Sequence, residues 1–365
     1  MQFVDDMHET QGLTEKTMRI GAKGENLIFL ISQPRSGSTL VQRILAVHPD
    51  IYTTSEPWLM LHPHYALRSD GYRAEYNEEL ARKAMEAFLQ VIPKGEDEYI
   101  KGVRRMYSYL YESALAGSGK RYFLDKTPRY YLIIPELFRT FPKARYIILF
   151  RNPLAVLCSV LKTWVKEDWF SLSGAKNDLI RAPRLLLGGL GLLGKGVVVI
   201  HYEPLVENPG GEVKRICDLL GLDFVPEMIE YGRLNLPHWS LGDAEGIYQH
   251  AQPATENIQK WVKMLADPQV WRLANDYLEL LGNEIVEEIG YPYQELRQLL
   301  EMHRPRRVSP RLTFPLAWLL NEPVKGPKRW MCGVSTLMML LRTRGVRGTA
   351  VAVMRGVAYA LSSPE

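Results

Sequence analysis

Continuous apolar runs alternate along the chain with segments whose apolar residues recur every three or four positions. The continuous runs predict buried strands of a parallel sheet, at residues 27–32, 122–124, 145–150 and 197–201. The periodic segments predict helices, at residues 39–47, 77–91, 130–141, 153–165, 211–220, 257–265 and 270–281. Strands that alternate with helices predict an α/β fold, in which helices flank a central parallel sheet.

Polar residues follow the predicted strands directly. They occupy positions 33–38, 125–127, 151–152 and 202–203. The carboxyl ends of parallel strands lie at one edge of a sheet, and ligands of such folds bind there. We therefore expect these four segments to meet around one site.

The first of these segments contains PRSGST, at residues 34–39, between a strand and a helix. A tight loop of small residues before a helix directs several backbone N–H groups at one point, where the helix dipole favours a phosphate. Arg35 adds a guanidinium, and Ser38 and Thr39 add hydroxyl donors. The segment is not a Walker A loop, which ends in Gly-Lys-Ser/Thr. The alternative is a plain strand-to-helix turn with a capping hydroxyl, a setting in which an Arg is unusual.

A second basic residue follows the strand at 145–150. Arg151 comes directly after this strand, and Ser159 lies eight residues later, about two turns along the predicted helix. The two side chains are placed to contact one anionic group. Taken by itself, a surface Arg in a helix-starting turn explains the segment equally simply.

In this order, the two segments resemble the 5′-phosphosulfate loop and the 3′-phosphate motif of the sulfotransferases that use 3′-phosphoadenosine 5′-phosphosulfate (PAPS). Residues 197–222, where a strand leads into Tyr-Glu, Leu, Asn-Pro and a helix, are similar to the family's third landmark. The similarity is greatest to the branch of protein-tyrosine and polysaccharide sulfotransferases, whose loop begins Pro-Arg-Ser-Gly. It implies a P-loop-like sulfotransferase fold, for a domain at residues 20–300 that binds PAPS and releases adenosine 3′,5′-bisphosphate.

The resemblance also implies roles for individual residues. The 5′-phosphosulfate would be bound by Arg35, Ser36, Gly37, Ser38 and Thr39, and the 3′-phosphate by Arg151 and Ser159. Tyr202 lies where the family has an aromatic residue near the adenine, although a Tyr that caps the core is a comparable interpretation. Lys126, in Asp-Lys-Thr-Pro, matches a Lys near the transferring group, or else it is a solvated charge at a strand end.

Sulfuryl transfer to an alcohol requires a base that removes the hydroxyl proton. In the protein-tyrosine branch this base is a Glu shortly after a His-Pro-Asp-Ile sequence, and Glu56 occupies that place here. The cytosolic branch uses a His near the position of Lys126, and this chain has no His between residues 65 and 200. Glu56 is therefore the predicted base, and His62 and His64 on the same loop are the alternatives.

The resemblance implies an in-line displacement at sulfur, in which Arg35, Lys126 and the loop N–H groups stabilise the developing charge. This scheme requires no metal, and the sequence contains no cluster with metal-ligand spacing. A later segment, residues 254–265, is similar to the family segment that closes over the cofactor. Asn257 or Lys260 is expected to contact a phosphate there, and Trp261 to belong to the core.

Composition argues against several other classes of protein. The 365 residues are 46% hydrophobic and 24% charged, and the net charge of +4 is too small to indicate a nucleic-acid ligand. Three scattered cysteines predict buried thiols in a reducing compartment. A polar N-terminus without an apolar leader, and the absence of an 18-residue apolar run, predict a cytoplasmic protein.

The chain departs from the family pattern in two segments. Residues 303–365 hold eleven Lys or Arg and two acidic residues, a net charge of +9. A mainly helical extension at 301–365 is predicted to pack on the core, to touch an anionic membrane surface, or to line the acceptor site. The glycine-rich segment 185–196 is expected to form a flexible apolar wall near the acceptor. Both segments favour a lipid-like or natural-product alcohol as acceptor.

Two other functions fit parts of the sequence. A P-loop-type kinase would use ATP and Mg²⁺, but it needs a loop Lys, which the PRSGST segment lacks, and Asp125 is the only candidate for a metal-binding Asp after a strand. A non-catalytic, membrane-associated nucleotide-binding module would explain the basic tail. The acceptor and the oligomeric state are open at this stage.

Overall fold

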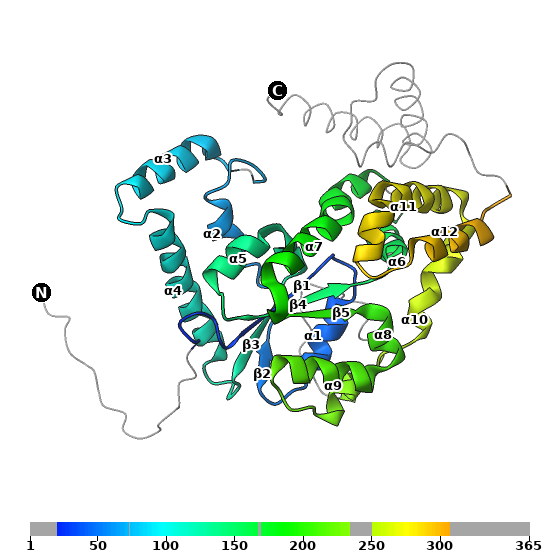
Figure 1. Cartoon of the computed structure of the whole chain (residues 1–365), viewed down its shortest axis with the longest axis horizontal. Helices are drawn as coiled ribbons and strands as arrows, with labels where there is room; N and C mark the ends of the chain where they lie inside the picture. The colour runs from blue at the N-terminus through cyan, green and yellow to red at the C-terminus, as the bar shows by residue number, and fades with distance from the viewer. Residues whose placement is uncertain (1–19, 73, 167–168, 234–249, 307–365) are drawn as a thin grey trace, which may run out of the picture.

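The computed structural model describes residues 20–72, 74–166, 169–233 and 250–306. Five parallel strands form a central sheet in the order β2-β3-β1-β4-β5, and helices cover both of its faces (Figure 1). The strands are β1 Leu27–Ser32, β2 Ile51–Thr53, β3 Tyr122–Lys126, β4 Arg145–Phe150 and β5 Val197–His201. The predicted α/β class with a parallel sheet is therefore confirmed.

The helices differ in length and type. The α-helices are α1 Ser38–Ala46, α2 Leu61–Tyr65, α3 Glu78–Gln90, α4 Glu96–Leu115, α5 Ile134–Thr140, α6 Pro153–Val160, α7 Ala182–Leu193, α8 Tyr202–Glu207, α9 Pro209–Leu220, α10 Glu256–Gln259, α11 Pro268–Glu288 and α12 Tyr293–Met302. The 3₁₀ segments are η1 Pro128–Ile133, η3 Trp169–Ala175, η5 Gly194–Gly196, η6 Pro226–Arg233 and η8 Lys260–Ala266. Two π-helical turns are η2 Leu161–Val165 and η4 Asn177–Arg181.

Strand β1 is buried on both faces, which explains its uninterrupted apolar sequence. Because side chains alternate along a strand, Phe29 faces a cluster built with α4, α5, α7 and η1, while Ile28 and Leu30 face a cluster built with α1 and α9. A third cluster joins α6 to η8, α11 and α12. The sheet is thus a rigid platform whose carboxyl edge carries the loops of interest.

Several predicted elements differ in detail from the structure. Residues 130–141 do not form one helix: η1 passes into α5 at Pro135, which has no N–H to continue the turn. Residues 257–265 likewise divide between α10 and η8. Strand β2 lies in a segment for which the sequence indicated a loop. Only three of its residues pair with β3, and such a short strand has no recognisable pattern.

The glycine-rich segment 185–196 is not a flexible wall, and this prediction was wrong. Most of it belongs to α7, a helix that packs against α5. A Cβ at Gly189 would lie 2.5 Å from Cδ1 of Ile134, so this glycine permits close approach of the helix. Glycine here serves packing and not mobility.

Two buried thiols, Cys158 and Cys217, agree with the prediction from composition. Cys332 and residues 307–365 of the basic extension lie outside the described residues, as do the helices and membrane contacts predicted for them. Among the described residues, no helix combines the length and apolar character needed to cross a bilayer.

Candidate active site

The four predicted polar segments meet at the carboxyl edge of the sheet. Arg151, after β4, donates from Nη1 to the carbonyl oxygen of Arg35, after β1, at 3.2 Å. The N–H of Asn152 donates to Glu203, after β5, at 3.1 Å. Residues more than a hundred positions apart along the chain thus surround one point, as the parallel topology predicts.

The loop between β1 and α1 contains two left-handed residues. Arg35 has φ 73°, and Gly37, which precedes α1, has φ 97°. A Cβ at Gly37 would lie 2.5 Å from Cδ2 of Tyr202, so both the backbone conformation and the packed ring require glycine. The small loop residue therefore lets an aromatic ring lie directly on the backbone.

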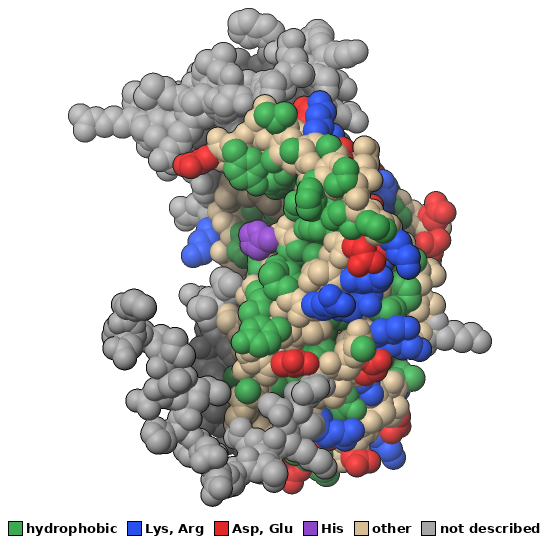
Figure 2. Space-filling view, turned by 90° about the vertical axis from the view of Figure 1, so that its left-hand side faces the viewer, with side chains coloured by type: hydrophobic (Ala, Val, Ile, Leu, Met, Phe, Trp, Pro, Cys, Tyr) green, Lys and Arg blue, Asp and Glu red, His purple; other side chains and the backbone are tan. Residues whose placement is uncertain are grey.

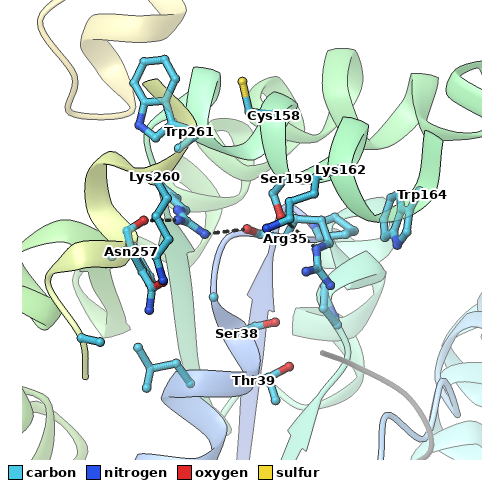
Figure 3. Close-up of a pocket in the computed structure, with 18 of the residues that line it drawn as sticks. Arg35, Ser38, Thr39, Cys158, Ser159, Lys162, Trp164, Asn257, Lys260 and Trp261 are labelled. Atoms are coloured by element: carbon cyan, nitrogen blue, oxygen red, sulfur yellow. Dashed lines mark hydrogen bonds between the residues drawn. The ribbon is translucent and has the colours of Figure 1, made fainter. Parts of the chain in front are cut away.

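A cavity of about 630 Å³ opens above this loop (Figure 3). Eight of the ten predicted site residues line it: Arg35, Gly37, Ser38, Thr39, Glu56, Arg151, Ser159 and Tyr202. Ser36 is buried beneath the loop, and Lys126 is buried behind Glu56, so neither reaches the surface of the cavity. Asn257, Lys260 and Trp261 line the cavity as well, and Trp261 also belongs to a core cluster.

Arg151 is fixed on three sides. Its guanidinium lies over the Tyr202 ring at 4.0 Å, and Nη2 donates to the carbonyl oxygen of Asn257 at 3.2 Å. Its Nε is buried and has no hydrogen-bond partner among the described residues. Other parts of the Arg151 side chain line the cavity, where the guanidinium supplies positive charge.

The side chain of Arg35, within the loop, contacts α6. Its Nε donates to the hydroxyl of Ser159 at 3.2 Å, which ties the loop to α6. Figure 3 shows Asn257 and Lys260 on one side of the cavity, and Arg35, Ser159 and Trp164 on the other. Ser159 is therefore paired with Arg35 in this structure, whereas the sequence suggested a shared anion with Arg151.

Glu56 is held by two donors. Nζ of Lys126 lies 2.6 Å from Oε1, and the indole Nε1 of Trp58 donates to Oε2 at 3.1 Å. The Lys126 side chain is 0% exposed and that of Glu56 is 12% exposed. The buried ammonium thus contacts the carboxylate directly, so Lys126 acts on the cavity through Glu56.

A second carboxylate, that of Asp125, precedes Lys126 in β3. Asp125, which is fully buried, accepts hydrogen bonds from the hydroxyls of Tyr111, Thr127 and Tyr130 at 2.7, 2.8 and 3.0 Å. Burial raises the pKa of Asp125 to about 6, and the three hydroxyl donors oppose that rise. The carboxylate is therefore ionised at neutral pH.

Sequence reasoning missed one wall of the cavity, formed by Trp58, Arg129, Lys162 and Trp164. The Arg129 guanidinium lies between two indoles, 5.3 Å from the ring of Trp58 and 5.6 Å from that of Trp164. The buried carboxylate of Asp178 accepts from Arg129 at 3.0 and 2.6 Å. In the sequence, Trp164 is only one position of a predicted helix and Asp178 falls in no predicted element, so no local pattern distinguishes them.

The two histidines considered as alternative bases do not line the cavity. His62 is exposed on α2, and His64 is buried against Thr140 of α5, 3.3 Å from its hydroxyl. Burial lowers the pKa of His64 to about 4. Within the described part of the chain, no three His, Cys, Asp or Glu side chains are grouped to hold a metal ion.

The parallel sheet, with a cation-bearing loop before its first helix, has the P-loop-like α/β arrangement. The chain belongs to the sulfotransferase family: the family model described as "Sulfotransferase family" matches residues 27–226. The nodulation protein NoeE of Sinorhizobium fredii is 31% identical over 293 residues, which cover 73% of this chain and 66% of that protein. A putative protein-tyrosine sulfotransferase of Caenorhabditis briggsae is 23% identical over 271 residues, covering 71% of this chain and 89% of the relative. The resemblance seen in the sequence is confirmed at the level of the family.

Two solved structures are similar to parts of this chain. The sulfotransferase domain of the Synechococcus PCC 7002 olefin synthase is 27% identical, with a TM-score of 0.45 over 64% of this chain and 86% of that domain. Mouse sulfotransferase SULT7A1, solved in complex with PAP, is 16% identical, with a TM-score of 0.40 over 75% of this chain and 89% of that one.

Proposed function

We propose that this chain is an enzyme that transfers a sulfuryl group from PAPS to the hydroxyl, or the amine, of an acceptor. One observation carries the proposal: Arg35 and Arg151, 116 positions apart, converge with Glu56 on one cavity. Two guanidinium groups fit a donor that is anionic at both ends. The volume of about 630 Å³ is within the usual range for nucleotide-sized ligands.

The residues present fit this donor. Arg35, Ser38, Thr39 and the amide of Gly37 are proposed to bind its 5′-phosphosulfate, whereas the amide of Ser36 already donates to the carbonyl oxygen of Gln33 at 3.2 Å. The 3′-phosphate is proposed to meet the guanidinium of Arg151, together with Ser159. The Tyr202 ring is proposed to lie near the adenine, with its place set by the contact with Gly37. When bound, PAPS supplies the sulfuryl group and a phosphate leaving group.

Glu56 is proposed to remove the acceptor proton. Each oxygen of its carboxylate accepts one hydrogen bond from the protein, which leaves a lone pair on each for the acceptor hydroxyl. Lys126 and Trp58 together hold the orientation of the carboxylate, so the proton moves to an oxygen already in place. Arg35 is proposed to balance the negative charge that develops on the donor.

The acceptor is proposed to enter along the wall of Trp58, Arg129 and Trp164, next to Glu56. No residue of 185–196 lines the cavity, so that segment no longer supports a lipid-like acceptor. We propose a sulfotransferase domain at residues 20–300; among the described residues, the last helix is α12, which ends at Met302.

Binding of adenosine 3′,5′-bisphosphate, measured by calorimetry, tests the donor site. We expect Arg151→Ala to weaken this binding by roughly ten- to hundredfold, since a charge-assisted hydrogen bond contributes about 1.5–3 kcal/mol. Arg184→Ala, on the exposed side of α7, is the matched control and should bind as wild type does. Tight binding of ATP with Mg²⁺, without binding of the bisphosphate, would instead favour the kinase.

Glu56→Gln tests the base. The variant should bind adenosine 3′,5′-bisphosphate normally but release it from PAPS, with a panel of alcohols or water as acceptor, about 10²–10⁴ times more slowly. The exposed Glu227→Gln is the control. Normal turnover by Glu56→Gln, with intact donor binding, would refute the assignment of the base and leave the donor site standing.

A further inference from the structure

The wall of the cavity next to Glu56 depends on unusual backbone. Trp58 has φ 56°, a left-handed conformation that bulky residues seldom adopt. Trp164 lies in the π-helical turn η2, and Asp178, which holds the Arg129 of this wall, lies in the π-helical turn η4. Turns of this kind are rare and frequently occur at functional sites, and a strained residue persists where its surroundings impose it. The positions of these side chains therefore indicate a functional role for the wall.

Asp178 occupies the binding edge of Arg129. Its carboxylate accepts from Nε at 3.0 Å and from Nη2 at 2.6 Å. Two parallel bonds of this kind are the geometry in which an arginine recognises the carboxylate of a ligand. Because Asp178 already fills this edge, an anionic acceptor cannot bind Arg129 in the same way.

The two charges of this pair offset each other away from bulk water. The side chain of Asp178 is 3% exposed and that of Arg129 is 31% exposed. On the outer side of the molecule that carries α3 and α4, side chains of both charges lie in solvent (Figure 2), and the ion pair of Lys83 with Glu79 there is 60 and 63% exposed. Water screens such surface pairs, whereas little water reaches Asp178, so its charge acts strongly on Arg129. The wall thus presents a flat guanidinium with little net charge.

Asp178 is itself held by three other elements. The hydroxyl of Tyr131, in η1, donates to Oδ1 at 2.8 Å, and Nε2 of Gln33, after β1, donates to the backbone carbonyl oxygen at 2.8 Å. Tyr277 of α11 donates to the next carbonyl oxygen of η4 at 2.9 Å. The carboxylate cannot turn away from Arg129 without losing the bond to Tyr131. Its position is therefore a fixed property of the wall.

The remaining charges of the cavity belong to the base or to the donor side. Glu56 is paired with a buried ammonium. Figure 3 shows Lys162 beside Ser159 and Arg35, the residues assigned to the donor. An acceptor next to Glu56 therefore meets two indoles and an offset guanidinium. A second carboxylate at this place would be repelled by that of Glu56.

We propose that Asp178 determines the class of acceptor: by offsetting the charge of Arg129, it selects an alcohol carried on an uncharged ring and excludes acceptors with an anionic group near the hydroxyl. Such selection presupposes the proposed sulfotransferase function. The flat indoles and the weakly hydrated guanidinium favour a ring that lies against them. Asp178 acts through Arg129, so it is a positioning residue that does not itself touch the acceptor.

Fluorine NMR of two small probes, 4-fluorobenzyl alcohol and 4-fluorobenzoate, tests this selection. The protein is first saturated with adenosine 3′,5′-bisphosphate, so that the arginines of the donor site are covered. Wild type should bind the alcohol at least about ten times more tightly than the benzoate. Asp178→Asn should shift the ratio of the two affinities by roughly ten- to hundredfold toward the benzoate, because the freed guanidinium can then form charge-assisted hydrogen bonds.

Two further variants separate charge from packing. Tyr131→Phe removes another hydrogen bond to the same carboxylate but keeps its charge, so it should retain the wild-type ratio. The double variant Asp178→Asn, Arg129→Leu should prefer the alcohol again, because no guanidinium is left for the benzoate. This double variant leaves no unpaired charge in the wall, and it keeps the proposal testable should the single variant not fold.

The affinity for adenosine 3′,5′-bisphosphate, measured in parallel, should be the same for wild type and Asp178→Asn. A wild type that prefers the benzoate or binds neither probe, an Asp178→Asn variant with the wild-type ratio, or a double variant that prefers the benzoate would overturn the acceptor selection alone. A wild type that does not bind the bisphosphate would overturn the proposed function, and the acceptor selection with it.

Discussion

Asp125 acts on the cavity without touching it. Two of its hydroxyl partners, Thr127 and Tyr130, accept backbone N–H groups from the loop that carries Glu56: Trp58 donates to Thr127 at 3.4 Å and Met60 donates to Tyr130 at 3.1 Å. The buried carboxylate thus orients two hydroxyls whose free lone pairs fix the loop. Because Lys126 is the next residue along β3, one strand end positions both the base and its cation.

Asp125→Asn should loosen this loop. The amide keeps the shape of the side chain but replaces one acceptor oxygen with a donor, so at least one hydroxyl loses its partner, at a cost of about 1–3 kcal/mol. We expect faster hydrogen exchange in residues 54–61 and slower turnover of PAPS. The affinity for adenosine 3′,5′-bisphosphate should be unchanged. Exchange followed by mass spectrometry, together with calorimetry, measures both effects.

The exposed Asp218→Asn, on α9, is the control for this substitution. Unchanged exchange in 54–61 together with lost turnover would contradict a positioning role, because the loop would then be intact without the carboxylate. Loss of donor affinity would also contradict it, since Arg35 and Arg151 make no contact with Asp125.

At the scale of elements, the packing of α2 on α5 depends on a neutral histidine. His64 is buried against Thr140, and nearby Arg68 and Glu136, themselves ion-paired at 2.5 Å, act on it in opposite directions. Burial is the larger effect, and it lowers the pKa of His64 to about 4, against about 6.5 in an unfolded chain. Unfolding therefore takes up a proton at any pH between these values.

This proton uptake gives a pH-dependent free energy of unfolding. The stabilisation from neutral His64 is fully present above pH 6.5 and is lost as the pH falls to about 4. At about 1.4 kcal/mol for each unit of pKa shift, the loss is on the order of 3 kcal/mol. Urea unfolding from pH 7 to 4 should show a steeper decline for wild type than for His64→Gln. Exposed His62→Gln, on the same helix, should follow wild type; equal slopes for all three proteins would disprove the linkage.

Burial, strand length and packing explain which elements could be predicted from the sequence. Long apolar runs such as β1 and β4 are buried on both faces, so their pattern is unambiguous. Strand β2 pairs through only three residues, and its sequence carries too few positions to show a period. The glycines of α7 suggest mobility when viewed locally, and only the contact with Ile134 reveals that Gly189 serves packing.

At the scale of the molecule, the residues of the site also fall into two groups: those that could be predicted from the sequence and those that could not. Arg35, Arg151 and Glu56 lie beside strand ends, and the parallel topology brings strand ends together. The wall of Arg129 and Trp164 depends on Asp178, a long-range contact with no signature in its own segment. Residues that act through tertiary contacts therefore cannot be recognised before the positions of the helices are known. Residues at strand ends can be predicted from the sheet topology.

The cavity joins segments that otherwise separate on unfolding: the loop after β1, the start of α6 and the turn at Asn257. A ligand that contacts all three should stabilise the whole described fold. Adenosine 3′,5′-bisphosphate at a hundred times its dissociation constant should raise the free energy of unfolding by about 2.7 kcal/mol. Adenosine 5′-monophosphate at the same concentration should raise it less, because it offers no 3′-phosphate to Arg151.

Urea unfolding with each nucleotide, for wild type and Arg151→Ala, separates the contributions. The variant should lose most of the advantage of the bisphosphate over the monophosphate, since the two ligands differ only in the group assigned to Arg151. Its stabilisation should return to about 2.7 kcal/mol when the bisphosphate is raised to a hundred times the variant's own dissociation constant. Equal stabilisation of wild type by both nucleotides would show that Arg151 does not contact the 3′-phosphate.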